Sequence, residues 1–461
     1  MKWFIMGYGK RGDFIMVDDI CALATPYGTS AIAIIRCSGP HAIELVSRIF
    51  KGKNLMNVKS HTIHFGTIYD HDEIIDEVLC NIFKAPHSFD GENTVEINCH
   101  GGSFVQHKLL QLLLKSGFRL AEPGEFSKRA FLNNRLDLTQ AEAIMDIISS
   151  QNEIALKASQ QALKKSTSAL IEHFRNRLLD VLAQIEVNID YPEYEDSIEV
   201  TIPYLKPILE EMILEMNEIL SNSEISKIAI HGIKTAIVGK PNVGKSSLLN
   251  MLLEEDKAIV SDIPGTTRDL VEGSLNIGNV TLHLIDTAGI HESDDLVEKI
   301  GIKRSSKAIE DADLIFLVLD ISNELDELDQ TLLHLTKDKN RIIIANKSDI
   351  RSCWNLDEMI PFSTIRRDGL EALRNKLLEV TMVDALNIEE AKFLGNQRQI
   401  DLMKQAMQAL KQALYACELS VDIDLIELDI KQAFEALGTI TGQAYPDELI
   451  TALFSKFCLG K

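Results

Sequence analysis

Apolar residues alternate in short runs near the start of the chain and recur at helical spacing over much of the remainder. Between about Val17 and Asn133 the strand-length runs are AIAIIR, HTIHFGTIY, DEVLCNIF and TVEINCH. The next segment, FVQHKLLQLLLKSG, has the length and spacing of a helix. This mixture predicts a compact α+β domain over residues 18–134.

From Leu136 the pattern becomes helical. One stripe of apolar side chains consists of Leu138, Ala141, Ile144, Met145 and Ile148. A second stripe, with spacings of 3 and 4, consists of Ile400, Met403, Met407, Leu410 and Leu414. We expect the second stripe to be core rather than a ligand surface. The two stripes predict one helical domain made of two separated segments, 135–230 and 386–461.

Residues 231–385, between those segments, predict an inserted α/β domain. Three strand-like runs each end in a polar motif: IKTAIV precedes GKPNVGKS (Gly239–Ser246), VTLHLI precedes DTAG (Asp286–Gly289), and RIIIA precedes NKSD (Asn346–Asp349). Because an open α/β sheet binds ligands at the carboxyl ends of its strands, the three motifs should meet at one edge. The predicted fold class is therefore multidomain, with α+β, α-helical and P-loop α/β parts.

GKPNVGKS fits the phosphate-binding pattern G-x-x-x-x-G-K-[ST]. Its backbone N–H groups and the following helix can hold phosphates, Lys245 can reach the β- and γ-phosphate oxygens, and the Ser246 hydroxyl can bind Mg²⁺. The predicted GTP-binding residues of this loop are Asn242, Val243, Gly244, Lys245, Ser246 and Ser247.

NKSD predicts which base is bound. The Asp349 carboxylate can accept two hydrogen bonds from the N1–H and 2-amino groups of guanine, and adenine offers no such pair. The other predicted GTP-binding residues outside the switch loop are Asp286, Thr287, Ala288, Gly289, Asn346, Lys347, Ser363, Thr364 and Ile365. Three motifs in this order predict a guanine-nucleotide domain.

SDIPGTTRD, between the first two motifs, predicts a switch loop. A threonine there can complete the Mg²⁺ shell and sense the γ-phosphate, and we choose Thr267 over Thr266. Ile290, which comes directly after DTAG, cannot orient the attacking water as a glutamine does in regulatory GTPases. Another group must do so, and the nearby carboxylates are Asp294, Asp295 and Glu298.

Length, charge and cysteine content narrow the function classes. The 461 residues suggest roughly three domains. The net charge of −22 argues against broad, non-specific nucleic-acid binding, but it allows a local basic patch or RNA brought by a basic partner. Seven scattered cysteines without a C-x-x-C pair indicate reduced, mostly buried thiols. No apolar run reaches the length of a membrane span, and residues 1–17 are a poor signal peptide, so we expect a cytoplasmic protein. These residues are either an N-terminal extension or an upstream start, with Met16 as the functional one.

The sequence resembles a known family over about Asp18 to Lys461. The segments that carry the resemblance are GKPNVGKSS, SDIPGTTRD, DTAGIHESDDLVEKIGI, FDGENTVEINCHGG, EPGEFSKRAFLNNRLDLTQAEAIMDII and FCLGK. Many GTPases share the nucleotide motifs, but the FLNNRLDL segment and a Cys-x-Gly-Lys terminus belong to the tRNA uridine-modification GTPases called MnmE or TrmE. The resemblance implies an N-terminal folate-binding domain and a discontinuous helical domain that carries an inserted GTPase domain.

The resemblance also implies a potassium-stimulated GTPase, because family members use K⁺ where other GTPases use an arginine finger. The matching K⁺ ligands are Asn242, Thr266 and the carbonyl groups of Ser261 and Ile263, while Mg²⁺ would be held by Ser246 and Thr267. Glu298 matches the water-orienting glutamate, so the implied catalytic residues are Glu298, Asn242 and Lys245. The switch residues expected to bind GTP are Ser261, Asp262, Ile263, Pro264, Gly265, Thr266 and Thr267.

Arg36, Glu96 and Lys461 match family positions that bind a tetrahydrofolate, and Arg135 stands where the family often has a lysine, so that the positive charge is kept. A guanidinium and a carboxylate can recognise the polar edge of a pterin, or its glutamate tail, by bidentate hydrogen bonds. The implied cofactor is 5-formyl- or 5,10-methylene-tetrahydrofolate. Lys461, with Cys458, would reach it on the C-terminal tail.

The implied activity is enzymatic. The chain would hydrolyse GTP and, as a homodimer in a heterotetramer with an FAD-dependent partner, add a carboxymethylaminomethyl or aminomethyl group to C5 of the wobble uridine of certain tRNAs. The alternative is a nucleotide-gated RNA-binding or ribosome-assembly GTPase without modification chemistry. Folate binding separates the two, because a ribosome-assembly factor has no use for it.

Overall fold

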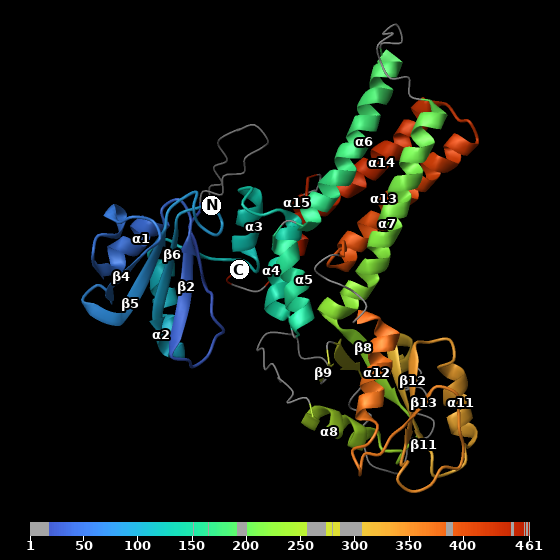
Figure 1. Cartoon of the computed structure of the whole chain (residues 1–461). Helices are drawn as coiled ribbons and strands as arrows, with labels where there is room; N and C mark the ends of the chain where they lie inside the picture. Colours follow the sequence, from blue (N-terminus) through green and yellow to red (C-terminus); the bar gives the residue numbers. More distant parts are fainter. Residues whose placement is uncertain are drawn as a thin grey trace. The chain divides into compact units, whose positions relative to one another are not determined.

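The computed structural model describes residues 18–150, 152–164, 166–190, 201–255, 273–278, 280–285, 307–383, 391–443, 447–455, 457 and 460. The chain divides into two compact units, one formed by Met1–Met145 with Thr441–Lys461 and the other by Asp146–Ile440. The first unit contains the blue sheet of Figure 1 together with C-terminal residues.

The first unit is built on a seven-stranded sheet. Its strands are β1 (Ile20–Leu23), β2 (Ile32–Ser38), β3 (Phe50–Gly52), β4 (Thr62–Asp70), β5 (Glu73–Phe83), β6 (Thr94–His100) and β7 (Arg119–Leu120). Their order is β3-β4-β5-β6-β2-β1-β7, and all neighbours are antiparallel except β1 and β7. The helices α1 (Ala42–Ile49) and α2 (Ser103–Lys115) share one apolar core with the sheet, and a short 3₁₀ turn spans Leu55–Asn57.

The cysteines of this sheet are free and buried. They are Cys21, Cys37, Cys80 and Cys99; elsewhere among the described residues Cys417 is buried and Cys353 is exposed. Burial raises the pKa of Cys21 and of Cys80 to about 12, so both stay protonated thiols at neutral pH. The expectation of free, mostly buried thiols is confirmed for these residues.

C-terminal residues complete the first unit. The helices α3 (Glu125–Leu132), α4 (Leu138–Ser149) and α15 (Asp447–Phe454) meet there, and Leu138, Phe454 and Phe457 form part of one small core. Gly124, just before α3, has φ +69°, and a Cβ on it would lie 2.3 Å from the carbonyl oxygen of Phe454. The close approach of α15 to α3 therefore requires glycine at this position.

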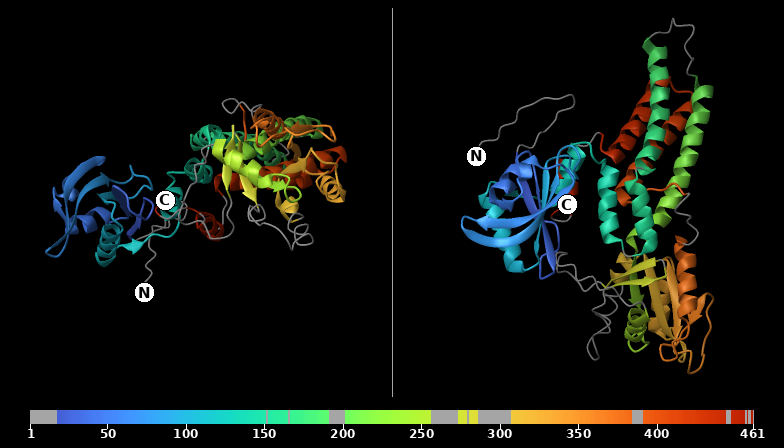
Figure 2. Two further views of the ribbon diagram at one scale, coloured as in Figure 1. Left: turned by 90° about the horizontal axis from the view of Figure 1, so that it is seen from below. Right: turned by 60° about the vertical axis from the view of Figure 1, so that its left-hand side comes forward.

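The second unit contains a helical bundle, in which α6 (Ser166–Asp190), α7 (Ile202–His231), α13 (Gln397–Glu418) and α14 (Ile423–Thr441) run side by side, while α5 (Glu153–Leu163) packs near their base (Figures 1 and 2). In the predicted stripe, Ile400, Met403 and Leu410 are buried, and Met407 and Leu414 pack half-buried against the same core. The prediction that this stripe is core is confirmed.

The α/β part of this unit has a six-stranded sheet. Its strands are β8 (Ile233–Val238), β9 (Ser274–Ile277), β10 (Val280–Ile285), β11 (Leu314–Asp320), β12 (Arg341–Asn346) and β13 (Met359–Pro361), in the order β13-β12-β11-β8-β10-β9. All neighbours are parallel except β9 and β10. The helices α8 (Lys245–Glu255) and α12 (Leu370–Thr381) share one core with the sheet, and α11 (Glu327–Leu335) contributes Leu332 to the core on its other side.

The chain leaves the bundle and returns to it at one place. The backbone N–H of Leu394 donates to the Ser223 hydroxyl at 2.8 Å, and the ring Nε2 of His231 lies 3.0 Å from the carbonyl oxygen of Gly395. The two ends of the α/β segment are therefore neighbours, as an inserted domain requires. The predicted fold class, with α+β, helical and P-loop α/β parts, is confirmed.

The bundle core gives a stability prediction. Met403→Ala should lower the free energy of unfolding by about 2–5 kcal/mol, because the fully buried side chain leaves a cavity. Leu214→Ala, on α7, removes a side chain that is 71% exposed and should change it by less than about 0.5 kcal/mol. Chemical denaturation followed by far-ultraviolet circular dichroism measures both, and equal effects would contradict the assignment of the core.

Candidate functional site

The phosphate loop connects β8 to α8, so it lies between a strand and a helix as its sequence predicts. Asn242 and Gly244 have φ of +60° and +100°. A Cβ on Gly239 would lie 2.3 Å from the carbonyl oxygen of Val318, so this glycine lets the loop pass β11. The Lys245 ammonium donates to the carbonyl oxygens of Gly239 and Lys240, both at 2.8 Å, and burial lowers its pKa.

Asn346, at the end of β12, ties the base motif to this loop. Its amide nitrogen donates to the carbonyl oxygen of Val243 at 2.8 Å, and its amide oxygen accepts from the backbone N–H of Thr364 at 3.4 Å. The side chain is 1% exposed. Because one amide contacts both segments, three predicted GTP-binding segments come together here: the phosphate loop, NKSD and Ser363–Thr364.

Asp349 is held in the ionised form that base recognition needs. The Ser363 hydroxyl donates to Asp349 Oδ1 at 2.6 Å, and this hydrogen bond lowers the pKa of the carboxyl. Ile365, two residues after Ser363, is 81% exposed. An ionised Asp349 can only accept, which suits the two N–H donors of guanine.

Asp320, which the sequence pattern did not single out, positions Lys347. The Lys347 ammonium lies 2.7 Å from Asp320 Oδ2, and the hydroxyl and backbone N–H of Ser322 donate to Oδ1. Burial alone would raise the pKa of Asp320, but hydrogen bonds from Lys347 and Ser322 lower it to about 2. The available signal was a carboxylate that ends the otherwise apolar run LIFLVLD.

Many predicted site residues lie outside the described residues. They are the switch residues Ser261, Asp262, Ile263, Pro264, Gly265, Thr266 and Thr267, the DTAG residues Asp286, Thr287, Ala288 and Gly289, and Glu298, Cys458 and Lys461. Within the described ranges, no group of three or more His, Cys, Asp or Glu side chains could hold a metal ion. The assignment of the undescribed site residues to Mg²⁺, K⁺, the attacking water and folate therefore stays a prediction.

Arg36 and Glu96 come together in the first unit. They face each other across β2 and β6, and the Arg36 guanidinium donates to Glu96 Oε1 at 2.8 and 3.1 Å. Its third nitrogen, Nη1, lies 3.4 Å from the carbonyl oxygen of Gly460, so the C-terminal segment reaches this pair. The guanidinium also lies 5.2 Å from the ring centre of Phe89.

Arg135 lines a cavity of about 460 Å³ in the same unit. The other lining residues are His61, Phe83, His87, Ser88 and Phe89. Arg135 Nε donates to the carbonyl oxygen of Ser88 at 3.2 Å. Phe89 contacts Arg36 and also lines this cavity, so the segment 88–89 connects the two predicted folate-binding groups.

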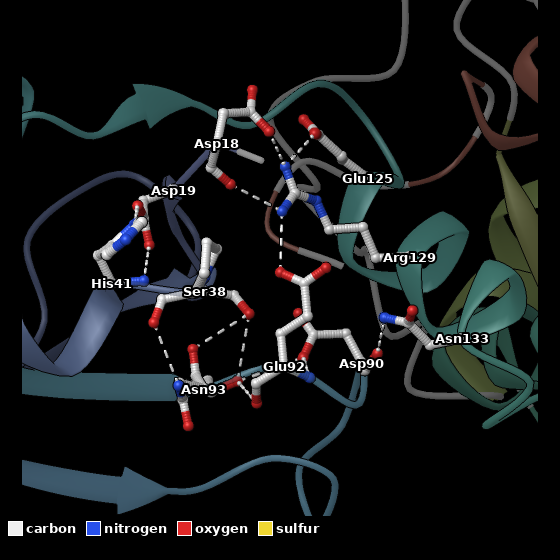
Figure 3. Close-up of polar contacts among 12 residues, drawn as sticks. Asp18, Asp19, Ser38, His41, Asp90, Glu92, Asn93, Glu125, Arg129 and Asn133 are labelled. Atoms are coloured by element: carbon white, nitrogen blue, oxygen red, sulfur yellow. Dashed lines mark hydrogen bonds and ion pairs between the residues drawn. The ribbon is translucent and has the colours of Figure 1, made fainter. Parts of the chain in front are cut away.

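A buried arginine, also not predicted as important, holds this segment in place. Figure 3 shows the Arg129 side chain of α3 among the carboxylates of Asp18, Glu92 and Glu125, at 2.7, 2.9 and 3.0 Å. Arg129 is 1% exposed. Asn133 adds a hydrogen bond of 2.7 Å to the carbonyl oxygen of Asp90. The helix therefore fixes the backbone that presents Phe89.

The pKa values of the carboxylates around Arg129 are shifted in different directions. Burial alone would raise the pKa of Glu125, but hydrogen bonds from Arg119 and from the backbone of Glu122 lower it. Burial raises the pKa of Glu92, and the nearby Arg129 offsets only part of this. Glu125 therefore favours its charged form, as does Asp18, whose pKa is also lowered, while Glu92 does not. The contribution of Glu125 to stability is lost as the pH falls through its lowered pKa.

A parallel α/β sheet with a phosphate loop and an NKSD motif at its strand ends defines a P-loop protein of the GTPase type. The family model described as MnmE helical domain matches residues 138–458, and the one described as GTP-binding protein TrmE N-terminus matches residues 19–135. The chain belongs to the MnmE family. No helix within the described ranges is long and apolar enough to cross a membrane.

Two curated relatives agree with this assignment. The chain is 49% identical to the tRNA modification GTPase MnmE of Acholeplasma laidlawii (strain PG-8A) over 96% of its own length and 99% of the relative. It is 48% identical to the protein of the same name from Streptococcus thermophilus (strain CNRZ 1066), over 96% and 98%. Among solved structures, Era in complex with MgGDPNP and a 16S ribosomal RNA segment is 30% identical over 32% of this chain and 56% of that chain, with a TM-score of 0.25.

The Arg129 cluster gives the second prediction. Arg129→Met should destabilise the first unit by about 3–5 kcal/mol, because it removes the cation that pairs with Glu92 and one of the two cations that pair with the buried Glu125. Arg48→Met, which removes an exposed ion pair with Glu44 in α1, should cost less than about 1 kcal/mol. Hydrogen exchange of the β1 and β6 amides in the full chain measures both, and a small effect at Arg129 would contradict the role of the cluster.

Proposed function

We propose that this chain hydrolyses GTP in the service of tRNA modification. The observation that carries the proposal is the 49% identity, over nearly the whole of both chains, to a protein named tRNA modification GTPase MnmE. The contact between the phosphate loop and the NKSD motif supports it, because a phosphate-binding pattern and a guanine-recognition pattern lie next to each other. In this proposal residues 18–134 would bind folate, residues 231–385 would bind GTP, and residues 135–230 with 386–461 would form the helical part.

For hydrolysis, Ser246 and Thr267 would hold Mg²⁺, and Asn242, Thr266 and the carbonyls of Ser261 and Ile263 would hold K⁺. These oxygen ligands suit hard cations. When bound, the cations would neutralise charge that develops on the phosphate groups. Lys245 adds a fixed positive charge, and Glu298 orients the attacking water.

For modification, the first unit would supply a tetrahydrofolate site. Glu96 can accept from the amino edge of a pterin, and Arg36, which already pairs with it, fixes its orientation. The cavity beside Phe89 has aromatic and cationic walls, with Arg135 among them, so it suits the remaining aromatic and anionic part of the cofactor. Lys461 would close the site, since Gly460 lies against Arg36.

The reaction would add a carboxymethylaminomethyl or aminomethyl group to C5 of the wobble uridine, with an FAD-dependent partner, in the cytoplasm. The chain would act as a homodimer within a heterotetramer. A second copy would cover an apolar surface of the first unit, where Ile63 and Phe65 on β4 are both 65% exposed and Leu79, opposite Phe65 on β5, is 44% exposed.

Base selection tests the nucleotide site. Asp349→Asn should weaken GTP binding by about tenfold or more and relax discrimination against xanthosine triphosphate, because the amide presents a donor to the donor edge of guanine. Competition binding with the two nucleotides measures this change. An unchanged nucleotide preference would remove Asp349 from the site.

The potassium requirement tests the hydrolysis site. GTP turnover should fall steeply when Na⁺ replaces K⁺, and Asn242→Ala should lose the response to K⁺, since it removes one side-chain ligand. Steady-state phosphate release in the two salts, at fixed ionic strength, gives the comparison. Equal rates for the unaltered chain in both salts would sink this part of the proposal.

A further inference from the structure

The second residue of the phosphate loop, Lys240, is fixed to a helix that no nucleotide motif includes. Its ammonium lies 2.7 Å from Asp326 Oδ2 and 2.7 Å from Asp329 Oδ2, both at the start of α11. The Asp329 side chain is 2% exposed, whereas that of Asp326 is 54% exposed. One of the two ion pairs is therefore shielded from water and the other is not.

The two aspartates are themselves held by the helix terminus. Asp326 is the N-cap of α11, and its Oδ1 accepts from the backbone N–H of Asp329 at 2.9 Å. Asp329 Oδ2 accepts in return from the backbone N–H of Asp326 at 3.3 Å. This reciprocal capping box keeps both carboxylates fixed in position before Lys240 is considered.

Lys240 is anchored through its backbone as well. Its carbonyl oxygen and that of Gly239 each accept a hydrogen bond of 2.8 Å from the Lys245 ammonium. The side chain of Lys240 thus attaches to α11 the same residue whose carbonyl positions Lys245. At the other end of the loop, Asn346 holds the carbonyl of Val243. The loop is clamped at two points, by α11 and by the end of β12.

We propose that Lys240, through Asp326 and Asp329, is a positioning residue for nucleotide binding: it holds the first half of the phosphate loop in the shape that receives the phosphates. The proposal rests on the proposed GTP-binding function. Its ammonium is engaged by two carboxylates, so Lys240 acts on the phosphates through the loop backbone and Lys245, not through its own charge. Of the two partners, the buried Asp329 carries most of the effect, because water screens the exposed Asp326.

The test measures release of a fluorescent GDP analogue from the full chain. Lys240→Met and Asp329→Asn should each speed release about tenfold, the scale of a lost charged hydrogen bond that is partly shielded. Asp326→Asn should have a smaller effect, and Lys240→Arg should restore a rate near that of the unaltered chain. Lys376→Met, which removes an ion pair with Glu379 on α12, is the matched control and should change nothing.

Guanosine separates a positioning role from a general loss of structure. It has no phosphate, so Lys240→Met should leave its affinity unchanged while GDP affinity falls. The double variant Lys240→Met with Asp329→Asn should release GDP within about twofold of Lys240→Met alone, because Lys240→Met already removes the ion pair that Asp329→Asn weakens. An unaltered release rate in Lys240→Met, or an equal loss of guanosine and GDP affinity, would overturn the inference. Failure of the unaltered chain to bind GDP would instead overturn the proposed function.

Discussion

The nucleotide half of this protein depends on one buried amide. The side-chain amide of Asn346, at the end of β12, donates through its nitrogen to the carbonyl oxygen of Val243 in the phosphate loop. Its amide oxygen accepts from the backbone N–H of Thr364. A Cβ on Gly244 would lie 2.2 Å from that amide nitrogen, so the contact also explains the glycine. The amide fixes the position of the phosphate loop relative to the base motif. The phosphates of a nucleotide whose guanine binds Asp349 would therefore lie at the phosphate loop without a rearrangement of the loop.

In the first unit, too, a buried polar side chain holds a segment of the predicted binding site in position. There a backbone segment, residues 88–92, carries Phe89 between Arg36 and the cavity, and it is α3 that holds it. The holding group is the buried Arg129, and its ion pairs with Asp18, Glu92 and Glu125 offset the cost of its desolvation. In both the nucleotide site and the predicted folate site, residues that would contact the ligand are held in position by residues that would not contact it.

The sequence predicted the parts of the nucleotide site that are local. GKPNVGKS and NKSD each follow an apolar strand, and parallel strands bring their carboxyl ends together, so adjacency follows from pattern alone. The supporting pairs did not follow from pattern. Lys240 and Asp329 are 89 residues apart, and Arg129 and Glu92 are 37 apart, so no periodicity links them. Arg36 and Glu96 were named from family resemblance, but their direct pairing depends on the register of β2 against β6. Thr267 and Glu298 remain predictions.

The central claim is that the joined loop and base motif form a site for a guanine nucleotide. The most direct measurement is calorimetric titration of the full chain with GDP and, separately, with ADP, in the presence of Mg²⁺. We expect one GDP site per chain and no detectable binding of ADP, because only guanine offers two donors to Asp349. Equal affinity for the two nucleotides, or binding of neither, would contradict this claim.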